Sequence, residues 1–170
     1  LSVMNGFAGE LRGRILSLVA HGYVQADAAG IRQWRELAQQ LQAHPEVLAV
    51  SPYISSKVIF GNGSVLRGAV LTAIDPSMEE NVSGIPQAML SGSLDSLDAD
   101  TFSVVLGATL ARMLGVQVGD RIEVTLPRLT VTPLGIFPRN KKLTVSGVFE
   151  IGAQQDVYQA YVSLAGGQKL

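Results

Sequence analysis

The sequence contains no cysteine, only two histidines and no dominant charge of either sign. The absence of cysteine excludes disulfides, thiolate catalysis and cysteine-ligated zinc, although it does not assign a compartment. The 13 Lys and Arg side chains nearly balance the 14 Asp and Glu side chains, for a net charge of −1. This balance argues against binding to nucleic acid through overall charge. No run of apolar residues reaches the ~18 that a membrane-spanning helix needs.

Motifs for catalysis and for metal or nucleotide binding are also missing. His21 and His44 lie in different predicted elements and have no nearby acid at ligand spacing. There is no Gly-x-Ser-x-Gly element, and the glycines at 61–64 and 166–169 lack the rest of a phosphate-binding loop. The acids between residues 74 and 100 do not follow the pattern of a calcium loop. We therefore predict no catalytic residue, no metal and no cofactor, and a protein that is not an enzyme.

The chain has enough apolar residues to form a core. Its hydrophobic fraction is 47%, and its 18 glycines indicate many turns. It does not begin with Met, and its first residues lack the basic region and apolar block of a signal peptide. We expect a domain of a longer protein, whose flanks hold any membrane anchor or energy source.

The first part of the chain has an α/β pattern. The apolar residues of a first predicted helix are spaced by three and four, and they are Met4, Phe7, Leu11, Ile15 and Leu18. A second helix is predicted over 31–43, because Pro45 prevents its continuation. Strands are predicted over 47–60, with an interruption at Pro52, and over 65–74. Asn62-Gly63 supplies the tight turn between these two strands.

The second part is rich in loops and then in strands. Residues 74–100 carry six acids and no base, with Gly, Ser and Pro86, which predicts short helical turns. A buried strand at 104–106 leads through Gly107 into a helix. Further strands are predicted over 121–126, 143–151 and 157–162.

The segment between residues 126 and 143 is too long for an ordinary hairpin loop. Its apolar residues are Leu129, Val131, Leu134, Ile136 and Phe137. Its basic residues, Arg128, Arg139, Lys141 and Lys142, give a local charge of +4. An apolar tip with a basic rim suits a partner that offers an apolar groove with an acidic edge. The alternative is a tip that folds back onto its own core.

Several segments resemble the periplasmic domain of the LolC/LolE family. The chain opens with Ser2-Val3-Met4-Asn5-Gly6-Phe7, followed by Glu10-Leu11 and Ile15-Leu16. Later matches are Val105-Leu106-Gly107, Leu110-Ala111, Leu114-Gly115-Val116, Gly119-Asp120 and Gly147-Val148-Phe149. Members of this family are membrane subunits of the bacterial lipoprotein-releasing ABC transporter and are related to MacB-type exporters.

This resemblance implies a partner-binding role. In the family, the membrane subunits act with a cytoplasmic ATPase (LolD-like) and a second membrane subunit to extract lipoprotein cargo from the inner membrane. The LolC-type subunit recruits a soluble carrier, LolA, through a protruding hairpin called the Hook. The resemblance thus implies an inner-membrane protein of a Gram-negative bacterium, with this domain in the periplasm and no nucleic-acid partner.

Residues 132–138 of this sequence look like the tip of the family's Hook. The implied carrier-binding residues are Arg128, Val131, Pro133, Leu134, Gly135, Ile136, Phe137, Pro138, Arg139 and Asn140. Glu123, Val131 and Asn140 depart from the LolC pattern, which bears on the strength of carrier binding. His21-Gly22 and residues 52–54 look more like LolE, so a LolF-like hybrid is a further interpretation.

The resemblance also implies an α+β fold with two lobes. Residues 1–74 form a Porter-like α/β lobe, which is expected to be incomplete because the family's periplasmic segment is longer. Residues 75–163 form a β-rich, Sabre-like lobe with the arm at 127–142, and residues 164–170 start the return to the first lobe. The change of pattern near Asp75 agrees with this division.

Two other functions stay open at this point. In one, a LolE-like domain forms a chamber wall that contacts lipoprotein cargo, and the arm is secondary. In the other, a MacB-like or FtsX-like domain transmits ATP-driven motion to a different partner. A proline-bounded apolar arm counts against the second of these.

Overall fold

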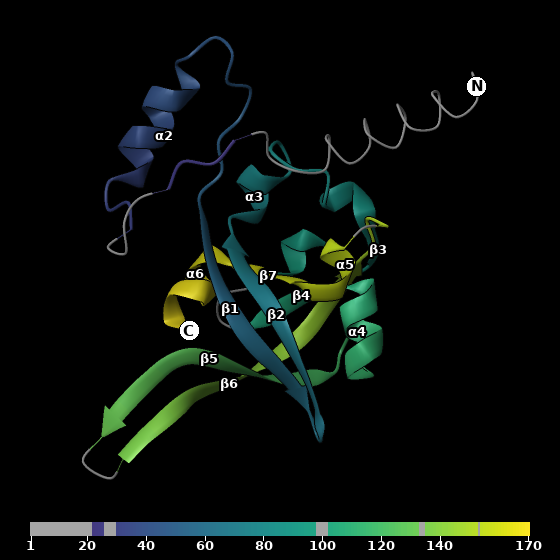
Figure 1. Cartoon of the computed structure of the whole chain (residues 1–170). Helices are drawn as coiled ribbons and strands as arrows, with labels where there is room; N and C mark the ends of the chain where they lie inside the picture. Colours follow the sequence, from purple (N-terminus) through teal and green to yellow (C-terminus); the bar gives the residue numbers. More distant parts are fainter. Residues whose placement is uncertain (1–21, 26–29, 98–101, 133–134, 153) are drawn as a thin grey trace, which may run out of the picture.

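The computed structural model describes residues 22–25, 30–97, 102–132, 135–152 and 154–170, and it has an α+β fold, as predicted (Figure 1). Its elements are α2 (Trp34–Gln42), β1 (Tyr53–Asn62), β2 (Val65–Ile74), α3 (Pro76–Glu79), η1 (Pro86–Ala88), β3 (Met89–Ser91), η2 (Leu94–Ser96), β4 (Ser103–Gly107), α4 (Ala108–Leu114), β5 (Arg121–Thr132), β6 (Gly135–Phe149), α5 (Gln155–Tyr158), β7 (Gln159–Ser163) and α6 (Leu164–Lys169). The predicted helix from Met4 to Leu18 lies outside the described residues.

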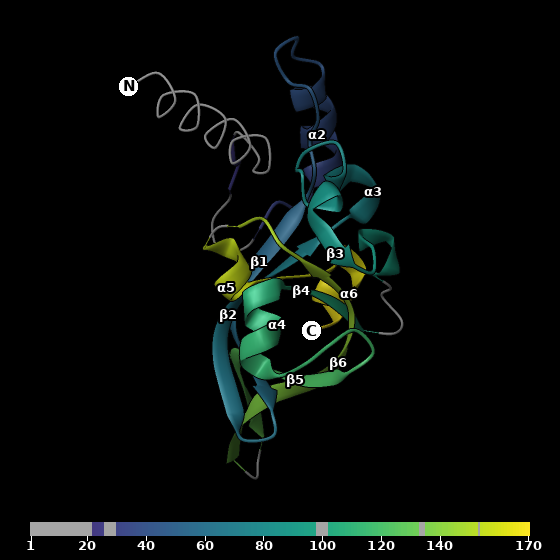
Figure 2. The same ribbon diagram turned by 90° about the vertical axis from the view of Figure 1, so that its right-hand side faces the viewer.

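The strands form one mixed sheet that closes on itself. Their order is β3-β6-β4-β7-β2-β1-β5, and β5 also pairs with β6. The β4–β6 and β2–β7 pairs are parallel, and the others are antiparallel. Thr144 of β6 marks the closure, because it is paired with both Arg121 of β5 and Ser103 of β4. Six strands therefore form a small barrel, which can be followed in Figure 2.

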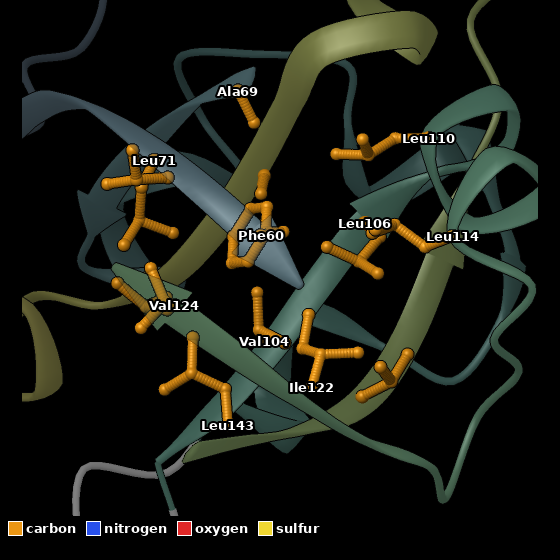
Figure 3. Close-up of a cluster of buried hydrophobic side chains, with 14 of the residues drawn as sticks. Phe60, Ala69, Leu71, Val104, Leu106, Leu110, Leu114, Ile122, Val124 and Leu143 are labelled. Carbon is orange, nitrogen blue, oxygen red and sulfur yellow. The ribbon is translucent and has the colours of Figure 1, made fainter. Parts of the chain in front are cut away.

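The main core fills the inside of this barrel (Figure 3). Side chains alternate between the two faces of a strand, so Val104 and Leu106 point inward, together with Phe60 of β1, which is fully buried. Leu110 and Leu114 of α4 complete the cluster. Because all six strands of the barrel contribute to the same interior, the barrel is stabilised by contacts between residues far apart in the sequence.

A second cluster lies on the outer side of β4, β6 and β7. Val105, Phe149 and Tyr161 belong to it, and the Phe149 and Tyr161 rings have centroids 5.5 Å apart. It is covered by the acidic stretch, which contributes Ile85 and Leu94. The short turns predicted there are present as α3, η1 and η2. The acidic stretch thus covers one outer face of the sheet.

Tyr161 offers a pH test of this cover. Its burial raises the pKa of its hydroxyl well above the usual range, with nearby Glu79 and Tyr23 raising it further. Because Tyr161 ionises at a lower pH in the unfolded chain than in the folded one, raising the pH above about 10 favours the unfolded chain. The free energy of unfolding therefore decreases above this pH, by up to about 1.4 kcal/mol per pH unit, and Tyr161 has no such effect below it. We expect alkaline unfolding to show this slope, and Tyr161→Phe to reduce it. An equal slope in the variant would contradict the assignment.

Several predicted boundaries were wrong. The helix predicted over 31–43 begins at Trp34, because Gly30 has a φ of 69° and a turn precedes the helix. The strand predicted from residue 47 begins at Tyr53, which pairs with Ile74, the last residue of β2. β2 ends there because the Asp75 side chain accepts a hydrogen bond from the Ser77 amide and starts α3.

The sheet contains strands from both of the predicted lobes. β1 and β2 precede the predicted boundary at residue 75, and β4 to β7 follow it, yet all of them share one sheet and one core. α6, within the predicted return at 164–170, packs against β2 and β7. The division into Porter-like and Sabre-like lobes stays a prediction. In the described residues, the strands on both sides of it form a single unit.

Candidate functional site

The predicted arm is a two-stranded antiparallel ribbon formed by the distal parts of β5 and β6. The segment between the strands predicted over 121–126 and 143–151 continues both strands, and Thr130 is paired with Phe137 and Val131 with Ile136. On β5, residues 129–132 alternate between apolar and polar, which is typical of a strand. The pairing joins backbone donors and acceptors that face each other across the two strands. In Figure 1, this ribbon extends away from the barrel.

Most of the predicted carrier-binding residues lie along this ribbon. In the ladder, Thr132 is opposite Gly135, Leu129 is opposite Pro138, and Leu126 is opposite Arg139. Arg128 falls between paired positions, where the register shifts between Leu126 and Leu129. Pro133 and Leu134 lie outside the described residues. The backbone therefore brings eight of the ten predicted residues onto one hairpin, namely Arg128, Val131, Gly135, Ile136, Phe137, Pro138, Arg139 and Asn140.

The root of the ribbon is anchored in the barrel. Ile122, Val124 and Leu126 alternate inward along β5 and are 1%, 0% and 7% exposed, and Leu143 of β6 is 1% exposed. On its other edge, β5 pairs with β1 only at residues 123–125. Among the described residues, therefore, the ribbon beyond Leu126 has no paired strand on either outer edge. A fixed root with a free distal part suits a projecting contact element.

Two of the four bases of the arm have partners at the root. The Lys142 ammonium lies 4.0 Å from the Glu123 carboxylate, with both side chains exposed. The Lys141 ammonium lies 5.1 Å from the centroid of the Phe102 ring. An exposed ion pair adds little stability, but it lowers the net positive charge at the root. The basic rim predicted from the sequence is therefore weaker on the barrel side than a count of the bases suggests.

Sequence reasoning missed the Glu123–Lys142 pair because the ladder is irregular. An unbroken ladder that starts at Thr132 and Gly135 brings Glu123 opposite Thr144. The register shift instead places Glu123 opposite Lys142. The signal available in the sequence was Pro127, because proline inside a strand is typical of an edge or a bulge.

Other kinds of site find no support in the part of the chain that the structure describes. It contains no group of three or more His, Asp or Glu side chains placed to hold a metal ion. It also has no helix with both the length and the apolar character needed to cross a bilayer. A cleft of about 390 Å³ is lined by residues that include Leu48, Val50 and Met78. Its other lining residues are Gln42, Ala49, Ser77 and Asn81, so it holds no nucleophile–base pair.

Comparison with known proteins identifies the class. The family of MacB-like periplasmic core domains matches residues 1–170. The chain is 37% identical over 171 residues to the lipoprotein-releasing system transmembrane protein LolC of Xylella fastidiosa (strain 9a5c), covering 100% of this chain and 41% of that protein. It is 35% identical to LolC of Neisseria meningitidis, covering 97% and 39%. It is 28% identical to LolE of Haemophilus influenzae, covering 99% and 41%.

The chain therefore belongs to the family of MacB-like periplasmic core domains. Along its whole length it is similar to LolC and LolE transmembrane proteins of lipoprotein-releasing systems, which confirms the resemblance seen in the sequence. The chain spans about two fifths of the length of these relatives.

Proposed function

We propose that this periplasmic domain recruits a soluble lipoprotein carrier, LolA-like in kind, through the β5–β6 ribbon. The observation that carries the proposal is the two-stranded ribbon, which is rooted in the barrel core and extends beyond it with unpaired outer edges. The sequence resemblance, in which residues 132–138 look like the tip of the family's Hook, also supports the proposal. The domain is then a binding module and not an enzyme.

The prolines of the ribbon favour recognition of its distal end over strand addition at its edges. Pro127 and Pro138 stand in β5 and β6, and Pro133 lies between these strands in the sequence; each lacks the backbone N–H that an added strand needs. Proline on an edge is a common protection against edge-to-edge pairing. The carrier then binds the apolar residues near the turn, with Val131, Ile136 and Phe137 in its groove. Arg128 and Arg139 steer the acidic rim of the carrier and act mainly on the association rate.

The whole protein belongs, in this proposal, to an inner-membrane transporter. Its LolC and LolE relatives are named as transmembrane proteins of lipoprotein-releasing systems. The other partners are lipoprotein cargo, a cytoplasmic LolD-like ATPase and a second membrane subunit. The ribbon corresponds to the arm of a Sabre-like lobe, and α2 belongs to a Porter-like lobe that the rest of the protein completes.

Alanine substitutions at the end of the ribbon test this function. Phe137→Ala and Pro133→Ala in the full-length protein are each expected to weaken capture of the purified carrier by about 1–3 kcal/mol, or about 5- to 150-fold, because buried apolar anchors dominate such interfaces. The measurement is carrier binding to the detergent-solubilised protein.

Leu66→Ala is the matched control for these variants. Leu66 is also a large apolar residue and is 62% exposed, but it stands on β2 of the barrel. Its substitution is expected to leave carrier capture unchanged. Unchanged capture in both ribbon variants removes the ribbon from the mechanism.

A LolE-like role in contacting cargo is a second candidate, favoured by apolar residues on the outside of the barrel. Ile59 and Leu66 are 46% and 62% exposed, and they stand at neighbouring positions of the β1–β2 pair. A photo-crosslinker at Leu66 that captures lipoprotein, with no carrier captured from Phe137, favours this role. Carrier adducts from Phe137 favour recruitment.

A further inference from the structure

The ladder between β5 and β6 contains an irregularity at the point where the ribbon leaves the barrel. Leu126 is opposite Arg139, and the next pair is Leu129 with Pro138. Pro127 and Arg128 therefore have no opposite residues on β6. Extra residues in one strand of an antiparallel pair form a β-bulge, which bends that strand and increases its twist.

The bulge lies directly at the last anchored residue. Leu126 is 7% exposed and belongs to the barrel core, and β5 pairs with β1 at residues 123–125 just before it. Figure 1 shows β5 and β6 curving away from the barrel as the ribbon extends. The position of the bulge thus separates a fixed root from the projecting part.

Two prolines stiffen both strands at this level. Pro127 is in the bulge, and Pro138 is the residue opposite Leu129. A proline ring fixes φ near −65° and holds the preceding residue in an extended conformation. A missing N–H costs no ladder hydrogen bond at Pro127, because the bulged residues are unpaired. A bulge alone bends a ribbon; a bulge with a proline on each strand also resists changes of the bend.

We infer that the Pro127–Arg128 bulge is a rigid corner that fixes the direction in which the β5–β6 ribbon leaves the barrel. The bulge supplies the bend, and the two prolines limit its variation. The consequence for carrier recruitment rests on the proposed function: a ribbon held in one direction loses less conformational entropy when it binds.

Distances between two spin labels test the corner without the carrier. These 170 residues contain no cysteine. In the full-length protein, with any cysteine elsewhere replaced by serine, Ser64→Cys at the exposed β1–β2 turn and Thr132→Cys at the end of β5 report the direction of the ribbon. Deletion of Pro127 and Arg128 removes about 6.6 Å of strand and is expected to shift the mean distance by several ångström. Pro127→Gly keeps the chain length and is expected to widen the distribution at least about twofold, because it frees φ.

Two controls separate a changed corner from a damaged fold. Arg128→Ala retains both the bulge and the prolines, and it is expected to leave the distance distribution unchanged. A second label pair, Ser64→Cys with Gln168→Cys, joins exposed positions in the β1–β2 turn and in α6. The distance between these two labels is expected to be the same in every variant. The inference is overturned if the ribbon distances are unchanged in both the deletion and Pro127→Gly. If the deletion alters the distance of the control pair, the distance distribution of Pro127→Gly alone tests the inference.

Carrier binding in the same variants tests the consequence. The deletion keeps residues 129–138 intact and is expected to weaken carrier capture about tenfold, whereas Arg128→Ala has the smaller effect of a rim charge. A shifted distance with unchanged capture overturns the link between direction and recruitment. If the parent protein captures no carrier, the proposed function fails, and the spin-label distances still decide whether the corner exists.

Discussion

Phe60→Ala is expected to lower the free energy of unfolding by about 3–5 kcal/mol, the range for removing a large aromatic side chain from a packed core. Phe60 is fully buried, and its ring lies inside the barrel among residues from both parts of the chain (Figure 3). It also sits where β1 bridges two neighbours, opposite Arg67 of β2 and Val124 of β5. The cavity left by the substitution therefore faces several strands at once.

Ile59→Ala is the control for this prediction. Ile59 precedes Phe60 on β1 and is 46% exposed on the outer face of the barrel. Its substitution is expected to cost less than about 1 kcal/mol, because little buried apolar area is lost. Urea denaturation of both variants measures the difference. Equal losses would contradict the assignment of inner and outer faces along β1.

Local patterns were sufficient to predict the hairpin elements. A tight hairpin joins β1 and β2, as predicted, and Gly63 has a φ of 59°. Its turn residues are Gly63 and Ser64 and not Asn62 and Gly63, because Asn62 is the last residue of β1 and pairs with Val65. The strand and helix on either side of Gly107 were also predicted, and they are present as β4 and α4. In these cases, the elements are determined by a turn residue and by the spacing of apolar residues within a short segment, so the local sequence is enough to predict them.

Closure of the barrel could not be predicted in this way. It depends on the parallel pairs of β4 with β6 and of β2 with β7, whose partners are separated by long stretches of chain. The continuous apolar run at 104–106 predicts a buried strand, but it does not show which strands lie beside it. The prediction of two lobes on either side of Asp75 came from the family resemblance and agreed with the change of sequence pattern there, but neither shows which strands pair.

The candidate site shows the same division. Its residues were located from a long proline-bounded segment with apolar and basic side chains, and the family resemblance gave them a role. The pairing of Val131 with Ile136 and the partner of Lys142 depend on the register. That register is set by the bulge after Leu126. Pro127 is the local sign of this bulge in the sequence, but a proline in a strand is equally typical of an edge. Carrier binding by these residues stays a prediction.

Gly92→Ala is expected to be the second most damaging of the substitutions considered, at about 2–5 kcal/mol. Gly92 has a φ of 73°, which costs an L-residue about 1–2 kcal/mol. A Cβ there also meets backbone atoms of β6, with the Ser146 carbonyl oxygen and the Gly147 Cα both closer than any real contact. Overpacking of this kind adds about 1–3 kcal/mol. Since Gly92 follows β3, its displacement also loosens the cover over Phe149.

Gly63→Ala separates the two causes of this loss. Gly63 has a similar φ of 59°, but a Cβ at this position meets no atom within 4 Å. Its substitution is therefore expected to cost only the backbone term of about 1–2 kcal/mol. Chemical denaturation of both variants gives the difference, which measures the close approach of Gly92 to β6. Equal losses would mean that the loop after β3 moves away from β6 at no cost, and the acidic stretch would then be a looser cover than its buried residues indicate.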